Sequence, residues 1–280
     1  LKNKPLCPQK LFIKMPARRM LNIDSVEIFK EIGKIEIFDP FFLKKKTAII
    51  DIRKRLLCDI EKARRWHSDR IFCRLVDEFT MRAAKGKTGS KLFTFFRSHP
   101  NVNIFNLSKS EFLRIFKGKR FAGNDAQVAL DCRKIFLNRY AGDWGKYFDE
   151  AEKLRGKNNF EDDPFLKIKG IGFKTRDLGL ESFSKDFIAI DVHIRRTLFR
   201  TGLIAKGFQY GLELPSGANY NKDYINFISI CRKISEEAKI SLMEMDKSLW
   251  YFGEKICGNE PKCNQCPLFN KNLCAFKRGV

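Results

Sequence analysis

Four of the nine cysteines stand close together near the end of the chain, in the spacing C-x5-C-x2-C-x7-C. They are Cys257, Cys263, Cys266 and Cys274. Thiolates at such spacings bind either a tetrahedral Zn²⁺ or a [4Fe–4S] cluster. Zinc ribbons tend to use two C-x2-C pairs, whereas this loop has a single pair. The spacing alone therefore leaves both groups open, and the other cysteines are interpreted as packing residues.

A turn with two glycines precedes this loop, because residues 166–175 read LKIKGIGFKT. Gly170 and Gly172 suit a tight turn between two helices, since glycine allows a positive φ and a close approach of the backbone. The amides that open the second helix would then be available to a phosphate oxygen. Lys167, Lys169 and Lys174 add positive charge. From these residues alone, an ordinary turn between packed helices is an equal alternative.

A second polar segment follows, in which residues 188–196 read IAIDVHIRR. Asp191 comes directly after an apolar run and is well placed to cap the next helix. By itself it need be no more than that cap. His193 is interpreted as a packing or hydrogen-bonding residue, because no partner at metal-ligand spacing accompanies it.

The segments that must position these residues have mostly helical periodicity. Ser108 and Glu111 predict a capping box at the start of a short helix that stops at Gly118. A longer helix is expected from Asn124 or Asp125 to near Gly142. Further helices are predicted over 49–60, 71–82, 223–237 and 242–252, with a loop at 215–219. No convincing series of strands is found, so the predicted fold class is all-α.

Composition limits the class of protein. The chain has 280 residues, 44% of them hydrophobic, which excludes a disordered protein. Its formal net charge of +22 implies a polyanionic partner, and nucleic acid is favoured over a membrane surface. The apolar runs are too short for a spanning helix and no secretory signal opens the chain. A soluble intracellular protein is expected.

Together and in this order, the K-G-I-G-F-K-T turn, the I-D-V-H segment and the four-cysteine loop resemble the helix-hairpin-helix (HhH-GPD) DNA glycosylases. The likeness is strongest to the endonuclease III branch. It covers about residues 69–276 and includes weaker similarity at 121–124 and 249–253. The family has a loop with Gly and Pro ahead of its aspartate, whereas residues 184–187 contain neither. That loop is expected to follow a different path.

The resemblance implies catalytic roles for two residues. Lys174 matches the lysine that forms a Schiff base, and Asp191 matches the essential aspartate. A lysine at this position indicates a bifunctional glycosylase with AP lyase activity. We expect the Lys174 amine to be neutral enough to attack C1′ of a flipped nucleotide, with Asp191 stabilising the cationic sugar. Lys167, Lys169, Gly170, Gly172 and Thr175 are the predicted DNA contacts.

The resemblance also favours a [4Fe–4S] cluster over Zn²⁺ at Cys257, Cys263, Cys266 and Cys274, although the family's outer gaps differ by one and two residues. Its lysine-bearing members act mainly on oxidised bases, and the cluster favours oxidised pyrimidines over 8-oxoguanine. Residues 81–90 are the predicted source of a side chain that fills the space of the flipped base. The expected partner is double-stranded DNA with a damaged base, bound by a monomer in the cytoplasm or nucleoid of a prokaryote or the nucleus of a eukaryote.

Three units are expected along the chain. Residues 1–68 form an N-terminal extension that packs on the cluster lobe. Residues 69–200 form a helical barrel lobe with the helix-hairpin-helix at about 160–185, and residues 201–280 form the C-terminal helices and cluster loop.

Two rival functions stay open. One is a monofunctional glycosylase for mismatched uracil or thymine, or for alkylated bases. The other is a DNA-binding module without enzymatic activity that uses the hairpin and a zinc loop.

Overall fold

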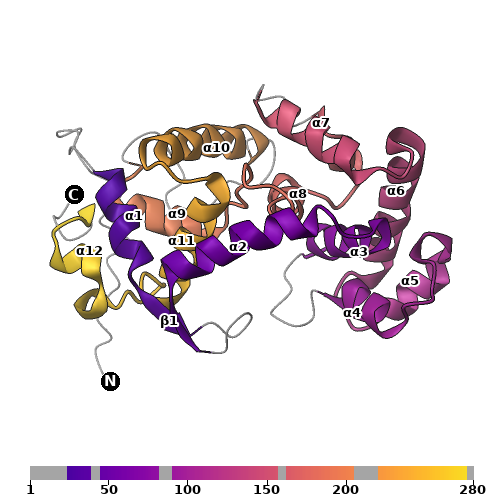
Figure 1. The fold of residues 1–280 in the computed structure, drawn as a ribbon, viewed down its shortest axis with the longest axis horizontal. Coiled ribbons are helices and arrows are strands. Elements are labelled where there is room, and N and C mark those ends of the chain that lie inside the picture. Colours follow the sequence, from indigo (N-terminus) through magenta and orange to yellow (C-terminus); the bar gives the residue numbers. More distant parts are fainter. Residues whose placement is uncertain (1–23, 39–44, 82–89, 157–161, 205–219, 276–280) are drawn as a thin grey trace, which may run out of the picture.

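The computed structural model describes residues 24–38, 45–81, 90–156, 162–204 and 220–275, and most of them are helical (Figure 1). The all-α class is confirmed. The strands in these ranges are short: β1 (Glu36–Phe38) and β2 (Lys46–Ala48) pair antiparallel, with Ile37 opposite Thr47. Among the helices in these ranges, none is long and apolar enough to cross a lipid bilayer.

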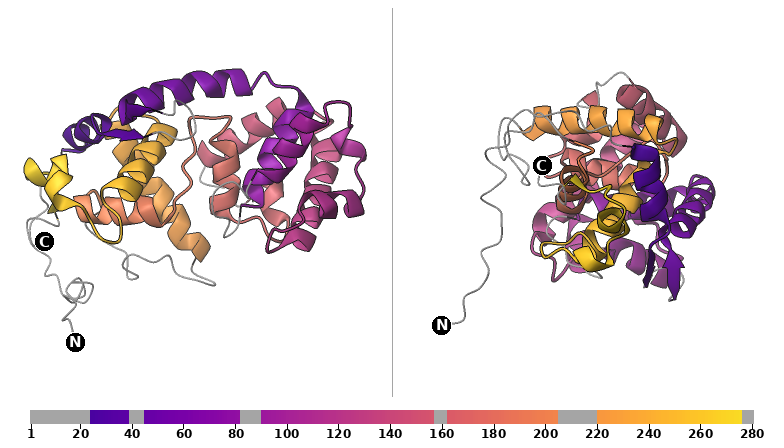
Figure 2. Two further views of the ribbon diagram at one scale, coloured as in Figure 1. Left: turned by 90° about the horizontal axis from the view of Figure 1, so that it is seen from below. Right: turned by 90° about the vertical axis from the view of Figure 1, so that its left-hand side faces the viewer.

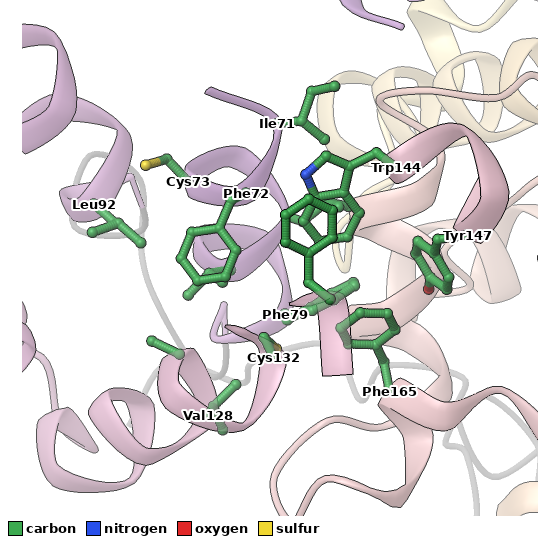
Figure 3. Close-up of a cluster of buried hydrophobic side chains, with 14 of the residues drawn as sticks. Ile71, Phe72, Cys73, Phe79, Leu92, Val128, Cys132, Trp144, Tyr147 and Phe165 are labelled. Atoms are coloured by element: carbon green, nitrogen blue, oxygen red, sulfur yellow. The ribbon is translucent and has the colours of Figure 1, made fainter. Parts of the chain in front are cut away.

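One of the two lobes is built from helices in the middle of the chain: α3 (Ser68–Phe79), α4 (Lys91–Ser98), α5 (Lys109–Ile115), α6 (Ala122–Tyr140) and α7 (Trp144–Gly156). Their apolar faces meet in a cluster rich in aromatic rings, which we call the aromatic core (Figure 3). The rings of Phe136 and Trp144 stack there with their centroids 4.0 Å apart. Phe165, just ahead of the glycine turn, is fully buried in the same core.

The other lobe brings together helices from both ends of the chain: α1 (Ser25–Gly33), α9 (Val192–Thr201), α10 (Tyr220–Glu237), α11 (Leu242–Lys255) and α12 (Pro267–Asn270). Their shared cluster, the terminal core, includes Ile28 of α1 and Leu268 of α12. Lys271 reinforces this contact with an ion pair of 2.9 Å to Glu31. Hydrogen bonds from Lys34 and Lys271 lower the pKa of the Glu31 carboxyl to about 2.

A long helix joins the two lobes. Helix α2 (Ile49–Ala63) starts with Ile49 and Ile52 in the terminal core and ends with Ala63 in the aromatic core. Figure 2 shows it running across both lobes. Near its start, Arg53 donates a hydrogen bond of 3.0 Å to Ser248 of α11. This helix confirms the amphipathic pattern predicted for 49–60.

Other predicted elements are confirmed with shifted ends. The capping box at Ser108 and Glu111 is present. Helix α6 begins at Ala122, so the expected start at Asn124 or Asp125 was wrong. Asp125 is instead buried in the first turn, where its carboxylate lies 3.2 Å from the Lys119 amine. The predicted loop at 215–219 and most of the 81–90 segment lie outside the described residues.

Candidate active site

The glycine turn connects two short helical segments. The 3₁₀ helix η5 (Pro164–Lys167) leads into it and α8 (Phe173–Leu180) leaves it. Gly170 has a φ of 108°, a conformation that favours glycine. Gly172 has extended backbone, and a Cβ added there would meet no atom within 4 Å. The turn thus exposes bare backbone at Gly172.

The side chains of the turn alternate between the interior and solvent. Ile168 and Ile171 are buried and hold the turn against the protein, whereas Lys167 and Lys169 are exposed. Exposed cations around accessible backbone match the surface expected for contact with a phosphate group.

Thr175 closes the turn from inside. Its hydroxyl accepts a hydrogen bond of 3.1 Å from the Gly172 amide and lies 3.1 Å from the Gly172 carbonyl. The side chain of this predicted DNA contact is therefore engaged in the protein, and its backbone amide is what could reach a ligand. The amides of Lys174 and Thr175 lie in the first turn of α8, where no helical carbonyl precedes them.

Buried ion pairs hold α8 against the neighbouring segments of the protein. Arg176 lies 3.0 Å from Asp163, ahead of the turn, and 2.8 Å from Asp177. Arg155 of α7 lies 2.6 Å from the same Asp177 carboxylate. All four side chains are almost completely buried. Breaking a buried pair leaves an uncompensated charge, at a penalty of about 3–5 kcal/mol. The helix that carries Lys174 is thus held rigidly in place.

The two predicted catalytic side chains both lie at the start of a helix. Lys174 is the second residue of α8, and Asp191 is the N-cap of α9. Both are half-buried. Within the described residues, the Lys174 amine makes no hydrogen bond or ion pair, and none joins it to Asp191. The amine is therefore available to a substrate.

Asp191 uses one carboxylate oxygen for the cap. Its Oδ1 accepts hydrogen bonds of 2.8 Å from the His193 amide and 3.0 Å from the Ile194 amide. This confirms the predicted N-cap. In the part of the chain that the structure describes, Oδ2 receives no hydrogen bond, so the second oxygen remains available. One carboxylate can therefore cap the helix and face a reacting sugar at the same time.

A second carboxylate lies close to Asp191. Asp246 of α11 is buried, accepts a hydrogen bond of 2.9 Å from the Ala189 amide and pairs with Lys247 at 3.1 Å. Burial raises the pKa of Asp246 against the lowering effect of Lys247, and the neighbouring Asp191 carboxylate raises it further. The segment ahead of Asp191 is thus attached to α11.

The four cysteines of the C-terminal loop all line one small, partly open pocket. Cys257, Cys266 and Cys274 are buried and Cys263 is half-buried. Within the described residues, no group of His, Cys, Asp or Glu side chains is arranged to hold a single metal ion. Four cysteines around one pocket are a donor set that either a [4Fe–4S] cluster or a Zn²⁺ ion can use.

The cysteine loop is attached to α9, the helix that Asp191 caps. Arg200 of this helix donates to the carbonyl of Gly258 at 2.6 Å and lies 3.7 Å from the sulfur of Cys257. The Cys274 thiol in turn donates to the Arg200 carbonyl at 3.2 Å. A metal or cluster bound by these cysteines would therefore stabilise the C-terminal end of α9.

The fold of the chain matches that of solved DNA glycosylases. A crystal structure of the 8-oxoguanine glycosylase/lyase of Methanocaldococcus jannaschii with 15mer DNA containing 8-oxoguanine matches 83% of this chain and 97% of its own, with a TM-score of 0.54 and 19% identity. A non-covalent endonuclease III–DNA complex matches the same shares of the two chains with a TM-score of 0.51 and 16% identity.

Sequence comparison points the same way. The curated 8-oxoguanine DNA glycosylase/AP lyase of M. jannaschii is 26% identical over 190 residues, which make up 66% of this chain and 79% of that protein. No family profile matches the chain. These comparisons support the resemblance found in the sequence: the chain has the fold of solved DNA glycosylases and is similar in sequence to a curated one.

Proposed function

We propose that this protein is a bifunctional DNA glycosylase that removes an oxidised base and then cleaves the strand as an AP lyase. One observation carries the proposal. In the described residues, the hairpin presents a half-buried lysine amine without a hydrogen bond or ion pair, and an aspartate with one uncommitted oxygen caps the next helix. The relative from M. jannaschii is itself named a DNA glycosylase/AP lyase, which supports this assignment.

The chemistry follows from these two groups. The damaged nucleotide leaves the base stack, because its C1′ is out of reach within a duplex. The Lys174 amine forms a bond to C1′ while the bond from C1′ to the base breaks, and the base departs with a proton. Asp191 stabilises the positive charge that develops on the sugar. Opening of the sugar ring gives an imine, and loss of a C2′ proton then expels the 3′ phosphate.

The name of the M. jannaschii protein supports 8-oxoguanine as the lesion. The sequence favoured oxidised pyrimidines, because the 8-oxoguanine relatives mostly lack a cluster. Both lesions are oxidised bases, and we place 8-oxoguanine first because a protein of that activity shares sequence over most of its length with this chain.

The direct test is borohydride trapping on duplexes that carry 8-oxoguanine, an oxidised pyrimidine, uracil or a thymine mispair. Borohydride reduces the imine to a stable amine, so a covalent protein–DNA adduct reports the lysine intermediate. We expect an adduct with an oxidised base, and most adduct with 8-oxoguanine. Base release without any adduct would contradict the lyase and favour a monofunctional glycosylase. Salt-sensitive binding without base release on any duplex would leave a binding module.

We further propose that the four cysteines hold a [4Fe–4S] cluster with a structural role. The pocket that all four cysteines line and the likeness of the chain to endonuclease III support this. When bound, the cluster would link the loop to α9 through its cysteine ligands. Protein purified without oxygen should be brown and contain about four iron and four sulfide per chain, and Cys266→Ser should lower both. One zinc per chain with no iron would refute the cluster.

A further inference from the structure

One tyrosine of α10 contacts both halves of the candidate active site. Tyr224 is fully buried, and its ring stacks on Phe173, with centroids 5.6 Å apart and planes inclined by 17°. Phe173 opens α8 and directly precedes Lys174. The Tyr224 hydroxyl donates a hydrogen bond of 3.0 Å to Asp177, one turn further along the same helix. Ring and hydroxyl together therefore hold the helix of Lys174.

The same hydroxyl reaches the segment that leads to Asp191. It accepts a hydrogen bond of 3.3 Å from the Ile190 amide and lies 3.3 Å from the Ile188 carbonyl. Ile190 is the residue immediately before Asp191. One oxygen atom of Tyr224 thus connects a carboxylate on the lysine helix with the backbone next to the aspartate.

The two sides of this connection are themselves rigid. Asp177 is held by buried ion pairs to Arg155 and Arg176, so the carboxylate that bonds to Tyr224 has a fixed position on α8. On the other side, Asp246 holds the Ala189 amide from α11. Among the described residues, the Tyr224 hydroxyl contacts both of these anchored parts directly.

We propose that Tyr224 is a positioning residue that sets the placement of Asp191 relative to Lys174. This inference rests on the proposed function. Tyr224 is fully buried beneath the site and acts through the two groups that meet the sugar. When an enzyme holds the reacting groups in position for attack, a displacement of one group by about 1 Å lowers the rate about 100-fold. Loss of the hydroxyl frees the Ile190 amide and lets the Asp191 segment shift.

The test is Tyr224→Phe, which keeps the ring on Phe173 and removes only the oxygen atom. The matched control is Tyr147→Phe. Tyr147 is also fully buried and its hydroxyl also bonds to a buried carboxylate, Asp163, at 3.2 Å, but it lies in the aromatic core. Tyr224→Phe loses the hydrogen bonds with Asp177 and the Ile190 amide, and Tyr147→Phe loses the one with Asp163. Melting curves should therefore show modest losses of stability, the larger one for Tyr224→Phe.

Rates are measured in single turnover with enzyme in excess over lesion duplex, well below the melting midpoint of every variant. Affinity is measured separately on a duplex with a tetrahydrofuran abasic analogue. We expect Tyr224→Phe to release the base and form the borohydride adduct about 10- to 100-fold more slowly, with affinity within about twofold of the wild type. Tyr147→Phe should stay within about threefold in rate.

A double-mutant cycle separates positioning from general loss of stability. If Tyr224 acts through Asp191, Tyr224→Phe should have little further effect on base release once Asp191 is replaced by asparagine. A rate of Tyr224→Phe that matches Tyr147→Phe, or an undiminished effect in the Asp191→Asn background, would overturn the positioning role. A wild-type protein that is inactive on every duplex would instead overturn the proposed function, and this role with it.

Discussion

Lys174→Gln should abolish the borohydride adduct and lower the rate of strand cleavage by about 10³-fold or more. Glutamine has nearly the length of lysine but no basic amine, so it cannot form an imine with C1′. The side chain is half-buried and makes no hydrogen bond or ion pair in the described residues, so its replacement breaks no bond within the protein. We expect the melting midpoint to stay within a few degrees of the wild type. Gel analysis of trapped protein–DNA adducts gives the result directly.

Lys169→Gln is the matched control for this prediction. Lys169 lies in the same turn, is exposed, and is predicted to contact DNA rather than to react. Its loss should weaken DNA binding and reduce the dependence of binding on salt, with the adduct preserved at saturating enzyme. An adduct of normal yield in Lys174→Gln would show that another amine attacks the sugar. In that case the hairpin lysine would be no more than a phosphate contact.

The sequence predicted the glycine turn and the helix cap because both depend on neighbours in the chain. The Thr175 hydroxyl bonds to Gly172, three residues earlier, and Asp191 caps amides two and three residues later. Interactions of this range leave a pattern that a single sequence shows. The amphipathic pattern of α2 and the capping box of α5 belong to the same class.

The residues that position the site could not be found in this way. The Tyr224 hydroxyl meets Asp177, 47 residues earlier, and Asp246 meets the Ala189 amide, 57 residues earlier. In the sequence, both side chains look like the polar positions of ordinary amphipathic helices. Their role depends on how α10 and α11 pack against α8 and the start of α9, which no local pattern contains.

The start of α6 and the two strands were also missed by the sequence-based predictions. Asp125 was expected near a helix start because aspartate favours the N-cap. Lys119 instead pairs with this carboxylate inside the fold, and α6 begins before it. The strands β1 and β2 have three residues each, too few for an alternating pattern to stand out. A tertiary contact thus outweighed the local preference at Asp125, whereas the strands were too short to leave a pattern.

Asp191→Asn should lower the rate of base release by about 10²- to 10³-fold and leave the fold intact. The asparagine side-chain oxygen can still accept hydrogen bonds from the His193 and Ile194 amides, so the cap of α9 survives. What disappears is the negative charge beside the developing sugar cation. Base release in single turnover and thermal melting, measured on the same preparation, separate the two roles of this residue.

Asp191→Ala completes the comparison, because alanine removes both the charge and the cap. Loss of an N-cap of this kind lowers stability by about 0.5–2 kcal/mol. We therefore expect Asp191→Ala to melt below Asp191→Asn while both show the same low rate of base release. If the asparagine variant kept wild-type activity and only the alanine variant lost it, the carboxylate would be a helix cap alone. Equal activity loss at unequal stability, by contrast, would assign the catalytic effect to the charge of the carboxylate that begins α9.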